Sequence, residues 1–152
     1  MWHLDFESGT SGSPTSVRRV RDLARLFPNA DPDDDRIVYQ TFGMSGEDTD
    51  EPHLRWATTV IEPGNVNGEP FMTRGHIHLN RDRGEWMMTL RGVGELRLKR
   101  PGESVVVETM QPGSVHLIDG SQAHRVVNTG AEPLAFVVVW LSDCGHDYEV
   151  DF

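Results

Sequence analysis

The sequence predicts an all-β protein, built as a single antiparallel sandwich or barrel of short strands. From Leu54 onward, β-prone runs recur at a spacing of roughly 8 to 12 residues, glycine- and proline-containing turns separate them, and no helical run stands between them. With 152 residues and 17.1 kDa, the chain is long enough for one domain with a full core and too short for two ordinary ones. Jelly-roll barrels are among the folds that meet this description.

The first 53 residues of this single domain, 1–152, hold an arm, one short helix and a first strand. Residues 1–15 are rich in small polar side chains, which indicates an arm without a core of its own. Apolar residues recur at helical spacing over 16–27, with a proline directly after them, and this pattern predicts the helix. The β-prone run 37–42 predicts the strand.

Two acidic runs, 31–35 and 46–51, flank that first strand. A calcium-binding loop needs alternating oxygen ligands, a defining glycine and a late glutamate, and neither run supplies this set. We therefore expect both runs to be solvated turns.

The barrel is assigned to residues 54–141, and residues 142–152 form a C-terminal segment that completes a pocket. Turns with Pro-Gly or Asn-Thr-Gly sequences divide the barrel region into short runs, and no repeat indicates a propeller or solenoid. The predicted strands are 54–61, 71–78, 85–91, 95–98, 105–109, 114–118, 124–128 and 134–141.

Composition excludes several classes of partner. The net charge of -10 argues against general affinity for nucleic acid or an anionic membrane, because both need a basic surface. Cys144 is the only cysteine, so no intramolecular disulfide can form, and the first residues lack the features of a secretory signal. The longest apolar run, 134–141, is far below the roughly 20 residues that span a bilayer. We expect a soluble, cytoplasmic protein.

Three histidines and one glutamate have the spacing of a metal site. His76 and His78 are two residues apart, so on a strand both imidazoles point to the same face. A hairpin through the following loop could bring Glu85 beside them, and His124, near the end of the sheet, could come across the barrel. This mixture of imidazole and carboxylate suits a divalent metal ion, iron in the first place, with manganese, nickel and zinc as alternatives.

The same residues match the two sequence motifs of the cupins, a group of jelly-roll barrels also described as double-stranded β-helices. Beyond that general pattern, the segments 73–78, 123–125 and 145–148 read Thr-Arg-Gly-His-Ile-His, Ala-His-Arg and Gly-His-Asp-Tyr. On these motifs the chain resembles the cupin-type phosphoglucose isomerases, also called glucose-6-phosphate isomerases.

This resemblance implies a homodimeric barrel that interconverts glucose 6-phosphate and fructose 6-phosphate with a divalent metal, in glycolysis and gluconeogenesis. Carried over by position, the metal ligands are His76, His78, Glu85 and His124. The resemblance places the substrate phosphate at Thr59, Thr73 and Gly75. It also implies that Glu85, His146 and Tyr148 are catalytic, with the last two completing the sugar pocket, and that Trp140 takes the place of a pocket tyrosine.

The chemistry expected of such a site is aldose–ketose isomerisation, which can follow two routes. In one, Glu85 acts as the base that moves a proton between carbons 1 and 2 through an enediol-like state. A carboxylate that coordinates a metal has a lowered pKa and is a poor base while it is bound. In the other route, a hydride shift between the two carbons needs no base.

Departures from the family pattern leave the substrate open to alternatives. Met87 and Trp140 stand where the family has tyrosines, and residues 119–122, Asp-Gly-Ser-Gln, replace its usual Pro-Pro-Tyr-Trp. Another sugar phosphate, a polyol or a keto acid is an alternative substrate. Two other classes of function also stay open: a metal-dependent oxygenase with the same ligands, and a cupin that binds sugar or metal without turnover.

Overall fold

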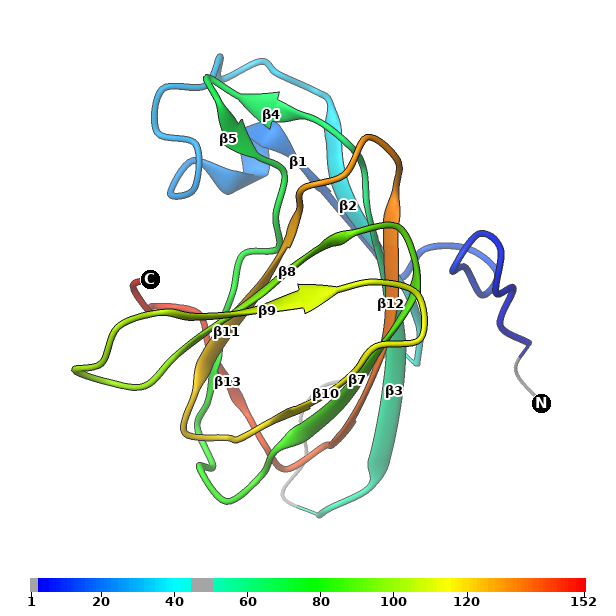
Figure 1. The fold of residues 1–152 in the computed structure, drawn as a ribbon, viewed down its shortest axis with the longest axis vertical. Helices are drawn as coiled ribbons and strands as arrows, with labels where there is room; N and C mark the ends of the chain where they lie inside the picture. The colour runs from blue at the N-terminus through cyan, green and yellow to red at the C-terminus, as the bar shows by residue number, and fades with distance from the viewer. Residues whose placement is uncertain (1–2, 45–50) are drawn as a thin grey trace.

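The computed structural model describes residues 3–44 and 51–152, so most of the acidic run 46–51 lies outside the described residues. The predicted all-β fold is confirmed (Figure 1). In the described part of the chain, no helix is long and apolar enough to cross a membrane. The elements are β1 (Ser16–Arg19), the 3-10 helix η1 (Val20–Leu23), β2 (Ile37–Gly43), β3 (Leu54–Ile61), β4 (Asn65–Val66), β5 (Glu69–Pro70), β6 (Ile77–His78), β7 (Glu85–Arg91), β8 (Gly94–Lys99), β9 (Val106–Met110), β10 (Val115–Ile118), β11 (Ala123–Asn128), β12 (Leu134–Leu141) and β13 (His146–Asp147).

Two sheets face one another and enclose the core. Over the described residues, a six-stranded sheet has the order β1-β2-β3-β12-β7-β10, and a three-stranded sheet has the order β11-β8-β9. Two-residue pairs, β4 with β5 and β13 with β6, add to this arrangement (Figure 1). All the strand pairs among the described residues are antiparallel, including those between strands far apart in the chain, such as β3 and β12.

Alternation along the strands explains which side chains fill the space between the sheets. Along β7, Glu85, Met87 and Thr89 are buried while the residues between them are not, and Leu96 and Leu98 alternate in the same way on β8. Since successive side chains of a strand point to opposite faces, one face of each sheet builds the core. Other members of this core include Val38, Ile61, Met110, Ile118, Val126, Leu134 and Phe136.

The predicted helix over 16–27 is largely wrong. Its first part is strand β1, which pairs with β2 from Ser16 opposite Thr41, and only Val20–Leu23 forms a short 3-10 helix. Forming one isolated helical turn fixes several dihedral angles for a single hydrogen bond, so a ladder of bonds to a neighbouring strand wins. The helical spacing of the apolar residues reflects burial of Val20, Leu23 and Phe27 in the core.

The predicted strand 71–78 is interrupted. Only Ile77–His78 forms a strand, β6, and the preceding residues make isolated bridges, from Met72 to Val127 and from His76 to His124. Gly75 has φ of 77°, a left-handed conformation that breaks a regular ladder. This break turns the chain so that it passes from the small sheet toward β13.

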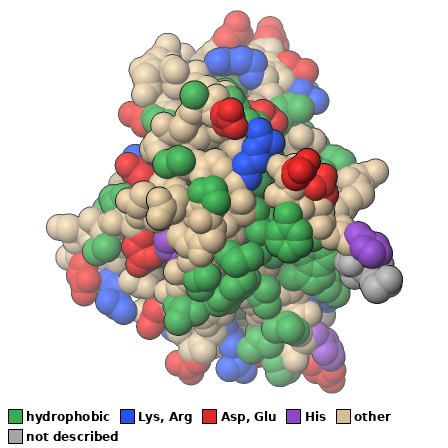
Figure 2. All heavy atoms as spheres, turned by 45° about the vertical axis from the view of Figure 1, so that its right-hand side comes forward, with side chains coloured by type: hydrophobic (Ala, Val, Ile, Leu, Met, Phe, Trp, Pro, Cys, Tyr) green, Lys and Arg blue, Asp and Glu red, His purple; other side chains and the backbone are tan. Residues whose placement is uncertain are grey.

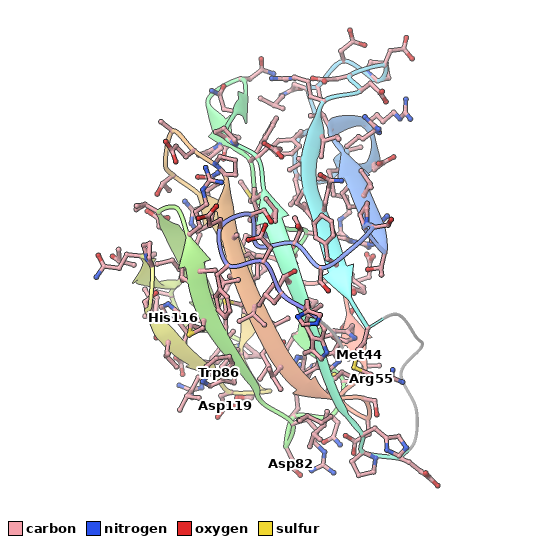
Figure 3. The ribbon with its side chains drawn as sticks, turned by 90° about the vertical axis from the view of Figure 1, so that its right-hand side faces the viewer. Met44, Arg55, Asp82, Trp86, His116 and Asp119 are labelled. Atoms are coloured by element: carbon pink, nitrogen blue, oxygen red, sulfur yellow. The ribbon has the colours of Figure 1, made fainter. Side chains whose placement is uncertain are left out.

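The N-terminal arm lies across the outer face of the large sheet, which Figure 3 views directly, with Trp86 labelled on β7. Gly9 packs so closely on β12 that an added Cβ would lie 2.3 Å from Cβ of Ala135. Arg91 donates a hydrogen bond to the carbonyl of Glu7 at 3.3 Å. The arm therefore covers the part of the face formed by Phe42, Val60, Leu90 and Ala135.

The turn between β7 and β8 packs closely against the residues that precede β12, and glycine substitutions can test this packing. Gly92 and Gly102 both have φ of 80°, but a Cβ on Gly92 would lie 2.5 Å from the carbonyl oxygen of Pro133, whereas a Cβ on Gly102 would meet nothing within 4 Å. We expect Gly102→Ala to lower the free energy of unfolding by about 1–2 kcal/mol through backbone strain. Gly92→Ala should cost about 1–3 kcal/mol more through overpacking. Equal losses for the two variants in urea unfolding would contradict this packing.

Candidate metal centre and active site

The four predicted metal ligands come together from three separate segments: residues 76–78, β7 and β11. His76 lies directly beside His124, because each donates its backbone N–H to the other's carbonyl, at 3.1 and 2.8 Å. The expectation that His124 crosses the barrel is therefore wrong. The hairpin expected between β6 and β7 is also absent from the described ladders, since β6 pairs with β13 and β7 with β10 and β12. Glu85 reaches the imidazoles from the inner face of β7.

The carboxylate of Glu85 lies between two of the imidazoles. Its Oε1 is 3.4 Å from Nε2 of His124, and its Oε2 is 3.6 Å from Nε2 of His78. The donor atoms of all four residues, His76 included, lie within 4.8 Å of one another. The side chains of His78, His124 and Glu85 are only 0, 3 and 5% exposed. One carboxylate and three imidazoles thus surround a single point.

The hydrogen bonds of the imidazoles test whether a metal ion fits at this point. Among the described residues, the Nε2 atoms of His76, His78 and His124 are buried without a hydrogen-bond partner. In two of the three rings the opposite nitrogen, Nδ1, is held by a backbone carbonyl: that of His78 contacts the oxygen of Arg83, and that of His124 the oxygen of Gln122 at 3.0 Å. A carbonyl partner fixes the proton on Nδ1 and leaves the lone pair of Nε2 for a metal. The residues therefore fit a divalent cation.

Burial and mutual contact shift the pKa values of these groups. Burial alone would raise the pKa of Glu85, but the charge of His124 and the contacts with both neighbouring imidazoles outweigh it and hold this pKa well below its usual value. Burial also lowers the pKa of His76 far below its usual value, and the charge of His124 adds to the effect. The site therefore offers an ionised carboxylate and, at His76, a neutral imidazole, the forms that bind a metal. Although burial opposes it, the charge of Glu85 raises the pKa of His124, so a metal ion would replace a proton there.

The metal ligands form one wall of a cavity of about 240 Å³. His76, Glu85 and His124 line it, whereas His78 is fully buried behind them. The cavity also brings together all the other residues that sequence motifs assigned to the site. These residues are Thr59, Thr73, Gly75, Trp140, His146 and Tyr148.

Polar groups in the cavity are held in position by contacts with neighbouring strands and rings. Thr73 accepts a hydrogen bond from the backbone N–H of Val126 at 3.0 Å, which leaves its own hydroxyl proton available. The ring of His146 stacks on that of Tyr148 at 6.0 Å between centroids and meets the ring of His76 edge-on at 4.6 Å. The pairing of β13 with β6 places His146 opposite His78 in the ladder.

Further residues of the cavity were not identified from the sequence. Tyr39 and Thr41, both on β2, line it, and Thr41 lies 3.5 Å from Thr59 between hydroxyl oxygens. Their spacing of two residues and the pairing of Thr41 with Thr59 put them on the inner face. The alternation was visible in the sequence, but the pairing of β2 with β3 was not. The cavity is also lined by Ala57, Arg74, Arg125, Val126, Phe136 and Val138.

The positions that depart from the family pattern lie in different places. Met87 and Trp140 line the cavity. Ser121 is not among the described residues that line it; its hydroxyl donates to Asp119 at 2.5 Å in the turn before β11. Of the three positions at which the family has a tyrosine and this chain does not, two therefore line the cavity.

Sequence comparisons relate the chain to enzymes of one activity. A family model described as glucose-6-phosphate isomerase matches residues 17–151. Glucose-6-phosphate isomerase of Pyrococcus horikoshii is 38% identical over 152 residues, covering 95% of this chain and 80% of the relative. That of Thermococcus litoralis is 38% identical over 153 residues with the same coverage. A putative glucose-6-phosphate isomerase 2 of Rhizobium meliloti is 32% identical over 140 residues, covering 88% of this chain and 70% of the relative.

Solved structures share the fold at much lower identity. Oxalate oxidase in complex with glycolate has a TM-score of 0.53 and 16% identity, over 63% of this chain and 46% of the other. Oxalate decarboxylase of Lactobacillus farciminis has a TM-score of 0.54 and 19% identity, over 72% of this chain and 30% of the other. These likenesses show the cupin fold alone.

Proposed function

The chain belongs to the cupin-type glucose-6-phosphate isomerase family, and we propose that its buried metal centre and adjoining cavity carry out the isomerisation. The protein is an aldose–ketose isomerase that interconverts glucose 6-phosphate and fructose 6-phosphate or a related pair of sugar phosphates. The observation that supports this assignment of the site is that one cavity is lined by three metal ligands together with the predicted sugar and phosphate contacts.

His76, His78, Glu85 and His124 would hold the metal ion, and the three unpartnered Nε2 atoms support that proposal. When bound, a divalent metal supplies a Lewis acid that polarises the carbonyl group of the sugar. Iron is our first choice and manganese, nickel and zinc are alternatives, since the donor set of imidazole and carboxylate suits all four.

Glu85 is the proposed base for moving the proton between carbons 1 and 2. It lines the cavity and is ionised at neutral pH, because its pKa is held well below the usual value. The same low pKa makes it a weak base, so the hydride-shift route stays as the alternative. His146 and Tyr148, stacked on one another beside His76, would orient the sugar hydroxyls and relay protons to them.

Thr59, Thr73 and Gly75 are the proposed contacts of the substrate phosphate, which hydroxyls and a backbone N–H can bind without a lysine. The two residues that replace family tyrosines in the cavity differ in their capacity to donate a hydrogen bond. Trp140 retains one N–H donor, whereas Met87 has no donor at all. We therefore expect weaker binding of the sugar phosphate with the same reaction.

The assignment is tested by a coupled assay of fructose 6-phosphate after the protein is loaded with iron or with manganese. We expect glucose 6-phosphate to form only in the metal-loaded protein. Full metal occupancy without turnover of any common sugar phosphate would contradict the proposal and favour a non-catalytic binding protein. Oxygen uptake by the iron-loaded protein would instead favour the oxygenase alternative.

A homodimer formed through the outer face of the large sheet is proposed as the working assembly. Apolar side chains gather there, below the N-terminal arm (Figure 2), and Leu54 and Leu117 are 69 and 77% exposed. Trp86, Val139 and Leu141 line the same shallow surface. Exposure of such an apolar surface to water is unfavourable, and the same face of a second copy of the chain would cover it.

Leu117→Arg should convert this dimer to a monomer, because it places a charge within the proposed apolar contact. Val106→Arg, on β9 of the small sheet, is the matched control, since Val106 is also exposed, at 56%. Light scattering on both variants and on the parent measures the molar mass. A monomeric parent, or an unchanged mass for Leu117→Arg, would contradict the proposed interface.

We also place this activity in the cytoplasm, in glycolysis and gluconeogenesis. The family membership supports the pathway, since both glucose 6-phosphate and fructose 6-phosphate belong to it. The single cysteine, which leaves the fold without an intramolecular disulfide, is consistent with a reducing compartment.

A further inference from the structure

A second group of metal-binding side chains lies beside the first centre. The Sγ atom of Cys144 is 3.7 Å from Nε2 of His146, and a donor atom of His78 lies within 4.8 Å of both. Cys144 and His78 are completely buried, and the Nε2 atom of His78 has no hydrogen-bond partner among the described residues. The geometry points to a second site, made of His78, Cys144 and His146, for a thiophilic divalent cation such as Zn²⁺ or Cd²⁺.

The separation of sulfur and nitrogen fits such an ion. Zinc binds cysteine sulfur at about 2.3 Å and histidine nitrogen at about 2.0–2.1 Å, so a tetrahedral angle places the two donor atoms about 3.6 Å apart. The observed separation of 3.7 Å agrees with this value. The two atoms form a hydrogen bond at this distance, and an ion that replaces the shared proton would find them at the separation it requires.

Backbone pairing holds the cysteine in this position. Asn80 donates its N–H to the carbonyl of Cys144 at 2.8 Å, and Leu79 donates to that of Gly145 at 3.2 Å. Gly145 has φ of 58°, and a Cβ added to it would lie 3.0 Å from the side chain of Leu79. The loop around Cys144 is thus packed against the residues that follow His78, and the ladder from His146 to His78 continues it.

The donor atoms explain which ions each site selects. The first centre contains a carboxylate and three imidazoles, which suit iron or manganese, whereas a thiolate favours softer ions. On binding, the S–H bond of Cys144 is replaced by a bond from sulfur to the metal, and the proton leaves to solvent. No electron transfer is involved, because Zn²⁺ and Cd²⁺ keep their charge.

The two sites share His78. Nδ1 of His78 is held by the carbonyl oxygen of Arg83, so only Nε2 can bind a metal, in one site or the other. Occupation of the second site therefore removes a ligand from the first centre and also takes up His146. We expect Zn²⁺ or Cd²⁺ to inhibit the isomerase, a consequence that rests on the proposed function.

Binding is tested without reference to activity by adding Cd²⁺ to the metal-free protein and recording the ultraviolet sulfur-to-cadmium charge-transfer band. The parent should give one cadmium per chain with this band, and Cys144→Ala should give none. His146→Gln should weaken the binding that produces the band by at least about 10-fold, as loss of a ligand requires. His124→Ala, which alters the first centre only, should retain the band.

No band in the folded parent, or an unaltered band in His146→Gln, would overturn the second site. A band that disappears in His124→Ala would also overturn it, because the ion would then belong to the first centre. The competition is tested by measuring the fraction of activity that Zn²⁺ removes from the iron-loaded parent and from Cys144→Ala, each relative to its own uninhibited rate. A parent without any isomerase activity contradicts the proposed function, while the cadmium band still decides the site.

Discussion

Replacing Glu85 by glutamine should lower kcat for the isomerisation of fructose 6-phosphate by about two to four orders of magnitude, the usual contribution of a positioned acid or base. Glutamine keeps the size of the side chain, which matters because Glu85 is buried on the inner face of β7. It removes the negative charge that lies 3.4 Å from Nε2 of His124 and 3.6 Å from Nε2 of His78. Both the proton transfer and the binding of a cation depend on that charge.

Two measurements separate these roles. The metal content of the assayed sample shows how much of the loss is due to an unloaded centre. Incorporation of deuterium from solvent into the product shows whether a base exchanges the proton at carbon 2, which a hydride shift does not do. Parent enzyme that incorporates deuterium would support Glu85 as the base, and parent enzyme that incorporates none would support the hydride shift.

Glu108→Gln is the matched control for this substitution. Glu108 also contacts a buried histidine, with its Oε2 at 2.5 Å from Nδ1 of His116, but it does not line the cavity. The chemical change and the type of partner are therefore the same. A loss of kcat that is as large for Glu108→Gln as for Glu85→Gln would contradict a specific role for Glu85.

The sequence was most informative where a β-prone run is bounded by turn residues at both ends. The predicted bounds 54–61, 85–91 and 134–141 coincide with β3, β7 and β12, all central strands of the large sheet. The spacing of apolar residues was misleading at 16–27. The first part of this segment pairs with another strand and the later apolar residues are buried in the core, and together they give the spacing of a helix. Backbone pairing decided that case, and it depends on β2, far along the chain.

For the site, too, the sequence predicted some features and not others. Motif spacing predicted the four side chains of the metal centre, and the family resemblance named further residues that line the cavity, such as Gly75. It could not predict how they meet, since the bridge from His76 to His124 joins residues that lie far apart in sequence. Tyr39 was missed for the same reason: only the register of β2 against β3 turns it inward.

His124→Ala should reduce the affinity for the metal ion by at least about 100-fold, since even the loss of an outer hydrogen-bond partner costs about 10- to 100-fold. The substitution removes one of the unpartnered Nε2 atoms and leaves Glu85 with one close imidazole in place of two. Equilibrium dialysis followed by elemental analysis measures the metal bound per chain. Activity should fall with occupancy.

The control for this experiment is His116→Ala. His116 is as buried as His124, at 5 against 3% exposure, and its ring nitrogens contact Glu108 and Ser114, so its loss costs about 1–3 kcal/mol of stability by leaving polar partners unpaired. Both variants delete an imidazole from a strand interior, and urea unfolding shows whether they are destabilised to a similar extent. Because only His124 contributes to the four-residue centre, His116→Ala should keep its metal. Equal metal retention by the two folded variants would mean that the imidazole beside His76 is not a ligand, and the centre would then have to be built from His76, His78 and Glu85 alone.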